Sequence, residues 1–384
     1  MKVFLVAGGH PQWNKTGEGI FAWDQALALK KSGLNIIYLV LDCRSIRRKR
    51  KLGFRFETVE NIPILGLSVP LGRIHFYIFS VIARFFFGIL FKKAVKLFGR
   101  PDIIHTHFIG MGVSALKVSI RESIPLIHTE HSSLIIQGNI GKCKLFIYAK
   151  VYRHATKVIA VSRALSKKIK LQFGVEAEVI PNVVDLAIFS LDNSTVKRDG
   201  ELRIVSAGNL IPSKQHDLTI STFSDLLCDF PSIHLTICGS GSDYGKLSNM
   251  INELNLRSHV TLTGHIPREK LARLFHNSSF FVLPSRFETF GLVYAEAMAA
   301  GLPVIATKCG GPEDIIIDCE EGLLIEVDDR DALEAAMRYM ILNVDNFDRS
   351  TISKNALHRF SPERIANELI NIYSDVLNLG YSYD

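Results

Sequence analysis

Residues 283–307, LPSRFETFGLVYAEAMAAGLPVIAT, limit the possible fold more than any other part of the chain. The apolar run at 279–283 suits a buried parallel strand, and residues 284–289 have no regular pattern. Residues 290–300 are strong helix formers that a glycine and a proline end, and a second apolar run follows at 304–307. A strand, a helix and a strand in this order predict a parallel α/β unit, whose ligands bind where the helix begins.

Two glutamates make this unit a candidate binding site. Glu288 precedes the helix and Glu296 lies within it. Between them the backbone amides of Phe290, Gly291 and Leu292 have no helical acceptor and suit phosphate, while each carboxylate can accept from sugar hydroxyls. The spacing fits a diphosphate flanked by two sugars, and two ordinary surface glutamates are the alternative that the pattern alone leaves open.

Short apolar runs alternate with helical segments along the rest of the chain, which predicts parallel sheets covered by helices. Further strands are expected at 3–7, 36–41, 103–106, 125–128, 158–161, 178–180, 203–206, 234–238, 260–263 and 323–327, and helices at 21–31, 215–228 and 362–377.

The length of 384 residues is large for one hydrophobic core and suits two domains. A linker is predicted at 186–200, because its last eleven residues are polar and charged without a periodic pattern. The expected fold is therefore α/β, with doubly wound, Rossmann-like domains at 1–185 and 201–360 and a terminal helix within 361–384.

The charge is divided between the two halves. Residues 1–180 hold 28 Lys and Arg against 10 Asp and Glu, whereas the remainder holds 17 against 28. The basic half should face an anionic partner such as a membrane, a phosphorylated acceptor or an acidic polysaccharide. No nucleic-acid motif accompanies this charge, so no nucleic-acid partner is expected.

The cysteines bear on the compartment. All six are scattered without a Cys-x-x-Cys pair, which argues against a zinc site and a disulfide framework and favours a reducing, cytoplasmic environment. Residues 2–9 are too short for a secretory signal, end in glycines and predict a first strand.

Two stretches of the basic half bear on membrane binding. Residues 44–55 carry seven basic and no acidic residues, which fits either a solvated loop or a surface that docks on anionic lipid. Residues 74–91 are apolar, but Arg84 interrupts them and two lysines follow, so they are not expected to span a membrane. A core helix is favoured. An interfacial helix is the alternative, because five apolar side chains share one face: Phe79, Ile82, Phe86, Ile89 and Leu90.

Strand ends in the first half carry glycines and histidines. Gly17 and Gly19 follow the first strand, where the backbone could approach a ligand, but their spacing fits no phosphate-loop fingerprint, and a plain loop fits equally well. His105, His107 and His131 lie at two further strand ends with a spacing that is a poor zinc signature. Buried, hydrogen-bonded histidines and histidines that face a ligand both fit this pattern, and no metal is expected.

The pattern Pro-Ser-x-x-Glu-x-Phe-Gly-Leu, continued by Glu-Ala-Met-Ala-x-Gly-x-Pro-Val, resembles the signature of glycosyltransferase family 4. The resemblance covers nearly the whole chain and is strongest at 200–330. It implies a GT-B fold, in which two Rossmann-like domains face each other across a cleft and a C-terminal helix crosses back to the first domain. It also implies retaining sugar transfer from a nucleotide-sugar donor.

The resemblance assigns roles to the candidates of both halves. It implies that Glu288 contacts the donor sugar, that Glu296 binds the donor ribose and that the amides near Phe290 and Gly291 serve the diphosphate and sugar. It implies further that residues of the first half line the cleft, His131 at the donor sugar, His105 and His107 nearer the acceptor, and Gly17 and Gly19 in the glycine-rich loop.

Lys214 lies at a helix start after a strand, where a cation can meet phosphate and where a solvated lysine fits equally well. The resemblance places it on the diphosphate, with Gly239 beside the nucleotide and the backbone of Ile266 beside the base. Asn209 stands where the family has Arg, and Gln215 where it has Gly. Asn offers dipoles in place of a bidentate charge, so weaker neutralisation of the diphosphate is expected.

The resulting prediction is a cytoplasmic retaining glycosyltransferase that uses a nucleoside-diphosphate sugar, UDP favoured over GDP. The acceptor is a hydroxyl of a glycan or lipid-linked molecule, in bacterial cell-surface polysaccharide synthesis. No cofactor is expected, and no carboxylate is placed as a nucleophile, so front-face substitution is favoured, as in the family. The alternatives are a non-catalytic partner that binds nucleotide or sugar, supported by Asn209, and peripheral attachment at the inner face of the plasma membrane through 44–55 and 74–93.

Overall fold

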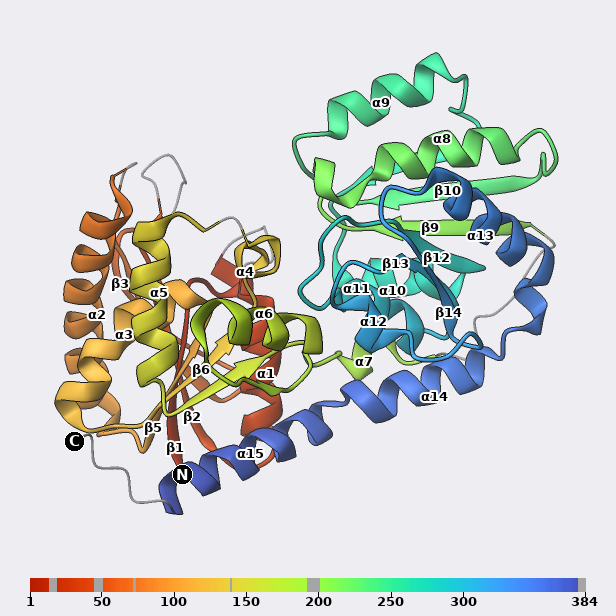
Figure 1. Ribbon diagram of the computed structural model, residues 1–384. Helices are drawn as coiled ribbons and strands as arrows, with labels where there is room; N and C mark the ends of the chain where they lie inside the picture. The colour runs from red at the N-terminus through yellow and green to blue at the C-terminus, as the bar shows by residue number, and fades with distance from the viewer. Residues whose placement is uncertain (14–18, 45–50, 72–73, 139, 192–200, 379–384) are drawn as a thin grey trace. The chain divides into compact units, whose positions relative to one another are not determined.

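The computed structural model describes residues 1–13, 19–44, 51–71, 74–138, 140–191 and 201–378 (Figure 1). The chain forms two compact units, Met1–Val183 with Pro362–Asp384, and Val184–Ser361. Gly17 and most of the predicted basic loop, residues 45–50, lie outside the described residues.

The first unit is built on an eight-stranded sheet in the order β3-β4-β2-β1-β5-β6-β7-β8. Its central strands are buried on both faces, as the apolar runs of the sequence require. The strands are β1 Lys2–Ala7, β2 Asn35–Asp42, β3 Gly53–Val59, β4 Ile62–Ser68, β5 Ile103–His107, β6 Leu126–Glu130, β7 Lys157–Ala160 and β8 Glu178–Val179.

Helices cover both faces of this sheet (Figure 1). The last helix of the chain, α15, packs against α1 through a shared core that includes Ile365, Leu369 and Tyr373. The helices of the unit are η1 Pro11–Trp13, α1 Ile20–Lys31, α2 Phe76–Phe98, α3 Ile109–Glu122, α4 Ser133–Gln137, α5 Lys142–His154, α6 Arg163–Phe173 and α15 Pro362–Asn378.

The hairpin of β3 and β4 was not predicted from the sequence. It pairs antiparallel at the edge of the sheet, and Glu60 and Asn61 form its tight turn with positive φ. Its first residues, 53–55, belong to the stretch that was interpreted as a loop or a lipid-docking surface. The alternation of apolar and polar residues in β3 is the signal that could have identified it.

As favoured from the sequence, α2 packs on the unit, and its inner face is made by Ser80, Ala83, Phe87, Leu90, Phe91 and Ala94. The five residues of the interfacial alternative do not form one outward face, because Leu90 is fully buried and of the five only Ile89 is exposed. Because the helix is apolar all round, periodicity did not identify the buried face. Within the described residues no helix is both long and apolar enough to cross a membrane.

The second unit is built on a six-stranded parallel sheet in the order β11-β10-β9-β12-β13-β14. Its strands are β9 Leu202–Ala207, β10 Ile233–Cys238, β11 Val260–Gly264, β12 Phe280–Leu283, β13 Val304–Thr307 and β14 Gly322–Ile325. Its helices are α7 Leu186–Phe189, η2 Pro212–Lys214, α8 His216–Leu226, α9 Tyr244–Glu253, α10 Arg268–His276, α11 Leu292–Ala299, α12 Pro312–Ile315, α13 Arg330–Asn343, η3 Val344–Asn346 and α14 Arg349–Phe360. All strands predicted for both units are present, with ends that shift by at most two residues.

Residues 186–191, predicted to belong to a linker, are part of the second unit. They contain α7, which packs against α10 and α11, and Phe189 is fully buried there against Phe275. The apolar residues of α7 therefore secure this segment to the unit. The rest of the predicted linker, 192–200, lies outside the described residues.

Candidate active site

The strand order of the second unit places its candidate site. The order reverses between β9 and β12, which are neighbours in the sheet although two strands separate them along the chain. At such a switch point the loops after the two strands diverge and leave a crevice at the carboxyl edge of the sheet. The loop after β9 carries Asn209 and Lys214, and the loop after β12 carries Glu288.

Lys214 and Glu288 meet at this switch point. The Lys214 ammonium donates to Glu288 Oε1, which also accepts from Ser285 Oγ at 2.9 Å. Both ionic side chains are largely buried, and Glu288 is only 8% exposed. The structure thus brings Lys214, predicted for the diphosphate, and Glu288, predicted for the donor sugar, into one ion pair.

A second set of contacts fixes the two loops. Asp328 Oδ1 accepts from Gln215 Nε2 at 2.6 Å and from Arg286 Nε at 2.7 Å, and the Arg286 amide donates to the Ser213 carbonyl at 2.8 Å. Gln215 has a positive φ of 52°, in the region that favours glycine. The backbone therefore keeps the conformation that a glycine would take, while the Gln side chain ties the Lys214 loop to the segment that follows β14.

The start of α11 offers backbone donors beside this ion pair. Gly291 is the N-cap with φ of 91°, and among the described residues no side chain caps the helix. The Tyr294 amide donates to the Gly291 carbonyl at 3.0 Å, so the amides available to an anion are those that precede it in the first turn, Leu292 included. Phe290 is buried in an edge contact with Phe360, which holds the loop from the inside.

A substitution at Gly311 tests how tightly the loop that contains Glu288 and Phe290 is packed. Its amide donates to the Glu288 carbonyl at 3.0 Å, and an added Cβ would overlap the backbone of Phe290. Gly311→Ala should therefore lower the free energy of unfolding by about 2–3 kcal/mol, measured by urea denaturation. Gly245→Ala in α9, where an added Cβ meets nothing within 4 Å, is the matched control and should be neutral or stabilising. Equal stability of the two variants would contradict the tight packing.

Glu296 is another buried carboxylate of the unit. It is 6% exposed, and its Oε1 accepts from Arg268 at 2.8 Å. Burial raises the pKa of Glu296, and the Arg268 guanidinium opposes this shift. Arg268 also lies over the Phe189 ring, 5.2 Å from its centroid. Arg268 and Ser285 were not predicted as site residues. Arg268 is distant from Glu296 along the chain and only the fold brings it there, whereas Ser285 stands in the same loop as Glu288.

The remaining predicted donor residues lie on neighbouring strand ends. Asn209 is exposed on the loop after β9, and Ile266 is half-buried after β11. Gly239 has a packing role, because its φ is 149° and an added Cβ would overlap the Gly208 carbonyl oxygen. The loops after β9, β10 and β11 are joined by backbone hydrogen bonds, so these residues share one edge of the sheet.

The predicted histidines lie together in the first unit, but they differ in their contacts. His105 is fully buried with Nδ1 2.6 Å from Tyr373 Oη and Nε2 2.7 Å from Thr129 Oγ1, which favours the structural alternative for this residue. His107 Nδ1 lies 3.0 Å from His131 Nε2. Within the described residues His107 Nε2 and His131 Nδ1 have no partner, so this pair keeps two free ring nitrogens.

A buried carboxylate that was not predicted positions His131. Glu130 Oε1 accepts from the His131 and Ser132 amides at 2.9 and 2.8 Å, and Oε2 accepts from Tyr152 Oη at 2.6 Å and lies 3.2 Å from His128 Nε2. Burial raises the pKa of Glu130, but these hydrogen bonds outweigh it and lower the pKa overall. Burial lowers the pKa of His131 to about 4, although Glu130 opposes that shift. His131 is therefore neutral at physiological pH.

The glycine-rich loop brings Gly19 and His10 to the carboxyl end of β1. Gly19 is the N-cap of α1 with φ of 88°, and an added Cβ would overlap the Gly9 carbonyl oxygen. His10 is buried, with its ring 4.3 Å from the Trp23 ring, and its nitrogens have no partner among the described residues. Burial lowers the pKa of His10 to about 4, which the Glu57 carboxylate opposes.

His10 should make stability depend on pH. An unfolded histidine titrates near pH 6.5, so the neutral buried ring stabilises fully above that pH and progressively less as the pH falls toward 4. His10→Phe should reduce the slope of unfolding free energy against pH by up to ~1.4 kcal/mol per unit in this window. Urea denaturation at several pH values measures the slope. The exposed His154→Phe should leave it unchanged, and an unchanged slope in His10→Phe would refute the assignment.

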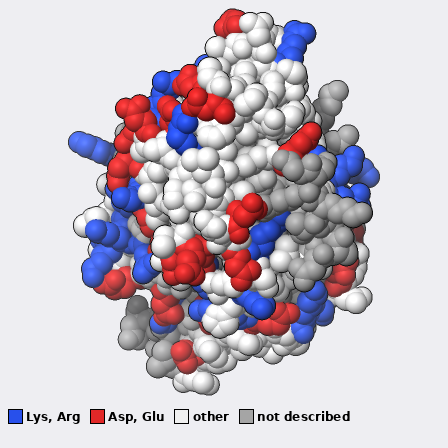
Figure 2. Space-filling model, turned by 90° about the vertical axis from the view of Figure 1, so that its right-hand side faces the viewer, with Lys and Arg blue, Asp and Glu red and all other residues white. Residues whose placement is uncertain are grey.

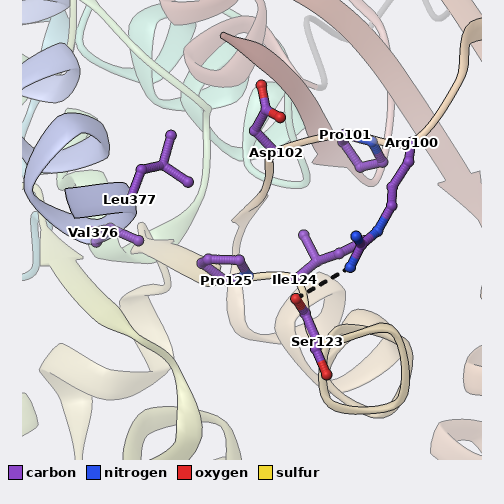
Figure 3. A pocket seen from close by; sticks show the side chains of 8 residues that line it. All are labelled: Arg100, Pro101, Asp102, Ser123, Ile124, Pro125, Val376 and Leu377. Carbon is purple, nitrogen blue, oxygen red and sulfur yellow. Dashed lines mark hydrogen bonds between the residues drawn. The ribbon is translucent and has the colours of Figure 1, made fainter. Parts of the chain in front are cut away.

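A pocket of about 300 Å³ in the first unit lies away from these residues (Figure 3). Asp102 and Pro125 precede β5 and β6, so the pocket opens at the amino edge of the sheet. Arg100 donates there to the Ser123 carbonyl at 3.3 Å, and α15 supplies Val376 and Leu377. Ligands of open α/β sheets bind at the opposite edge.

The structure describes no metal centre, since no three His, Cys, Asp or Glu residues in the described ranges are grouped to hold an ion. Asp329 caps α13, because its carboxylate accepts from the Ala332 amide at 2.9 Å at the start of the helix.

Family models match both halves of the chain. Residues 17–188 match the family described as Glycosyltransferase Family 4, and residues 188–359 match that described as Glycosyl transferases group 1. An uncharacterized glycosyltransferase of Methanocaldococcus jannaschii is 30% identical over 282 residues, which are 72% of this chain and 76% of the relative. A D-inositol 3-phosphate glycosyltransferase of Nocardioides sp. is 25% identical over 320 residues, 74% of this chain and 69% of the relative.

Solved structures agree with the fold. Sucrose-phosphate synthase from Thermosynechococcus elongatus has a TM-score of 0.83 and 21% identity, over 99% of this chain and 100% of that one. HepE of Anabaena, solved in complex with UDP, has a TM-score of 0.76 and 20% identity, over 97% and 99%. These likenesses confirm the expected GT-B class of two Rossmann-like units. The sequence matches go further than the fold, and they show that the chain belongs to the group 1 glycosyltransferases of glycosyltransferase family 4.

Proposed function

We propose that the chain is a retaining glycosyltransferase that takes a sugar from a nucleoside diphosphate held at the β9/β12 switch point. The main support is the Lys214–Glu288 ion pair beside the uncapped start of α11. A cation and free amides at one place suit a diphosphate, and a carboxylate beside them suits sugar hydroxyls. Glu296, one turn into the helix, is the candidate for the ribose hydroxyls.

The same residues support a mechanism. As the bond from the anomeric carbon to the phosphate oxygen breaks, negative charge grows on the diphosphate, where Lys214 and the α11 amides stabilise it. The acceptor oxygen forms the new bond on the same face, and its proton passes to the leaving phosphate oxygen. Glu288 already accepts from Lys214 and Ser285, so it serves better to orient the sugar than to attack it.

The histidines of the first unit supply a second group of candidates. The His107–His131 pair has two free ring nitrogens in the described part of the chain, and burial lowers both pKa values. A neutral imidazole can donate or accept, which suits a hydroxyl of the donor sugar for His131 and of the acceptor for His107. Both ring nitrogens of His105 are engaged by Tyr373 and Thr129, so we assign this residue a structural role beside the His107–His131 pair.

UDP is the favoured nucleotide, because structural relatives are described in complex with UDP and UDP-glucose. The acceptor class is a glycan or lipid-linked hydroxyl in cell-surface polysaccharide synthesis. No metal or other cofactor is required in this proposal, since Lys214 and the amides supply the positive charge.

A thermal-shift panel of UDP, GDP, ADP and their common sugars, with EDTA present, tests the proposal. UDP should raise the melting temperature most, because a ligand that binds only the folded state stabilises it. NMR of the sugar released from the stabilising donor should then show slow hydrolysis with retained anomeric configuration. No shift with any nucleotide would refute the donor site, and an inverted product would refute the retaining mechanism.

The alternative of a non-catalytic binding protein has one observation in its favour, Asn209 at an exposed position where the family has Arg. This alternative predicts a thermal shift without turnover of any donor, even with a mixture of glycan acceptors. Turnover that Asn209→Arg increases would instead support an enzyme with a weakened phosphate contact.

A further inference from the structure

The helix α2 has an outer face as apolar as its inner one. Its inner side chains pack on the first unit, but Tyr77, Ile78, Val81, Phe85 and Ile89 point outward with large exposed areas. Tyr77 is 58% exposed and Phe85 65%. These five residues, which we call the α2 stripe, form one line along the helix, because Val81, Phe85 and Ile89 follow the adjacent Tyr77 and Ile78 in steps of three to four residues. A helix that is apolar all round is usually covered on all sides.

A groove runs beside the stripe, between α2 and α3. It has a volume of about 500 Å³, and Val81, Phe85, Gly88 and Ile89 form its α2 side with Val118 on the α3 side. All four charged residues that line it are cations: Arg84, Lys92, Lys117 and Arg121. Arg84 donates to the Val113 carbonyl at 3.2 Å, and Arg121 pairs with Glu122.

The positive charge extends over the neighbouring helices. The helices α2, α3 and α5, which pack against one another, hold ten Lys and Arg and a single acidic residue, Glu122. Phe146 on α5 is also exposed, with Lys150 over its ring. In contrast, the face in Figure 2 has both signs interspersed. Apolar side chains and excess positive charge therefore coincide on these three helices.

This coincidence identifies the partner. A second copy of the chain would bring the same ten cations together in a two-fold contact, which like-charge repulsion opposes. A bilayer with anionic headgroups satisfies both features, because the stripe can enter the acyl boundary while lysines and arginines reach the phosphates. No described helix can cross a membrane, so the contact is with the surface.

We propose that the α2 stripe and the basic groove dock the first unit on an anionic lipid surface. Phe85 enters the interface, and Lys92 and Lys117 contact headgroup phosphates. The proposal goes beyond the transfer reaction and does not depend on it, since all its residues lie outside the second unit.

Co-sedimentation of the whole chain with vesicles tests the proposal. The chain should bind vesicles of phosphatidylcholine with about 30% phosphatidylglycerol at low salt, but not phosphatidylcholine alone, and should dissociate at about 0.5 M NaCl. Phe85→Ser should weaken binding about tenfold, because one large apolar side chain no longer enters the interface. Reversing Lys92 and Lys117 to Glu should weaken vesicle binding about fivefold for each positive charge removed. The loss should be larger at low salt than at high salt.

Two matched controls come from the second unit. Leu342→Ser removes an equally exposed apolar side chain from α13, and Lys354→Glu reverses an exposed lysine of α14. Both should bind as the unchanged chain does, and all variants should keep their melting temperature. Equal losses in the controls, or no binding to anionic vesicles at low salt, would overturn the proposal. Dimers in light scattering that Phe85→Ser abolishes would overturn it in favour of a second copy.

Discussion

Glu288→Gln should lower the rate of sugar transfer by about a thousandfold, the size of effect seen when one preorganised polar contact is lost from an active site. The amide has the shape of the carboxylate and can still accept from Ser285 and Lys214. The amide lacks the negative charge of the carboxylate. That charge holds the Lys214 ammonium in place and makes the carboxylate a strong acceptor for sugar hydroxyls. The rate with saturating donor measures the effect.

Glu326→Gln is the control for this variant. Glu326 pairs with Lys308 at 2.6 Å on the exposed surface of the same unit. The Glu326→Gln variant should therefore transfer sugar at an unchanged rate. Circular dichroism and the melting temperature should show that Glu288→Gln remains folded. A folded Glu288→Gln variant with undiminished transfer would remove Glu288 from the site.

Lys214→Met should lower kcat by about a hundredfold to a thousandfold. The methionine keeps much of the lysine stem but removes the charge that meets the leaving diphosphate. Because that negative charge grows as the glycosidic bond breaks, kcat should fall more than KM rises. Steady-state kinetics over a range of donor concentration separates the two parameters.

Lys308→Met, which breaks an exposed ion pair of the same unit, is the matched control and should alter neither parameter by more than about twofold. If Lys214→Met raised KM and left kcat intact, Lys214 would bind the donor equally in the ground and transition states. The assignment of the charge to the leaving group would then be wrong.

The structure also explains which parts of the fold and of the candidate site could be predicted from the sequence. The unit at 283–307 was predictable because local signals agree: an apolar strand, helix formers, a glycine stop and a second strand. Contacts between residues that are distant in the sequence were not predictable. Arg268 reaches Glu296 only because α10 and α11 pack together, and Tyr152 reaches Glu130 only inside the fold.

Two errors have a clear physical origin. The outward face of α2 in the interfacial alternative was misassigned, because the apolar residues of this helix leave no polar stripe to distinguish its inside from its outside. The segment at 186–191 was assigned to a linker because α7 is one short turn, too brief for a periodic pattern, and the burial of Phe189 depends on α10. The roles of the candidate site residues stay predictions, since they depend on ligands.

Hydrogen–deuterium exchange with and without saturating UDP tests whether a nucleotide binds at the β9/β12 switch point. If the diphosphate binds at the β9/β12 switch point, backbone amides should be protected in residues 208–216 and 285–296, where Lys214, Glu288 and the start of α11 lie. The α2 and α3 helices of the first unit should exchange as before. Unchanged exchange in both segments with UDP, GDP and ADP alike would contradict the account.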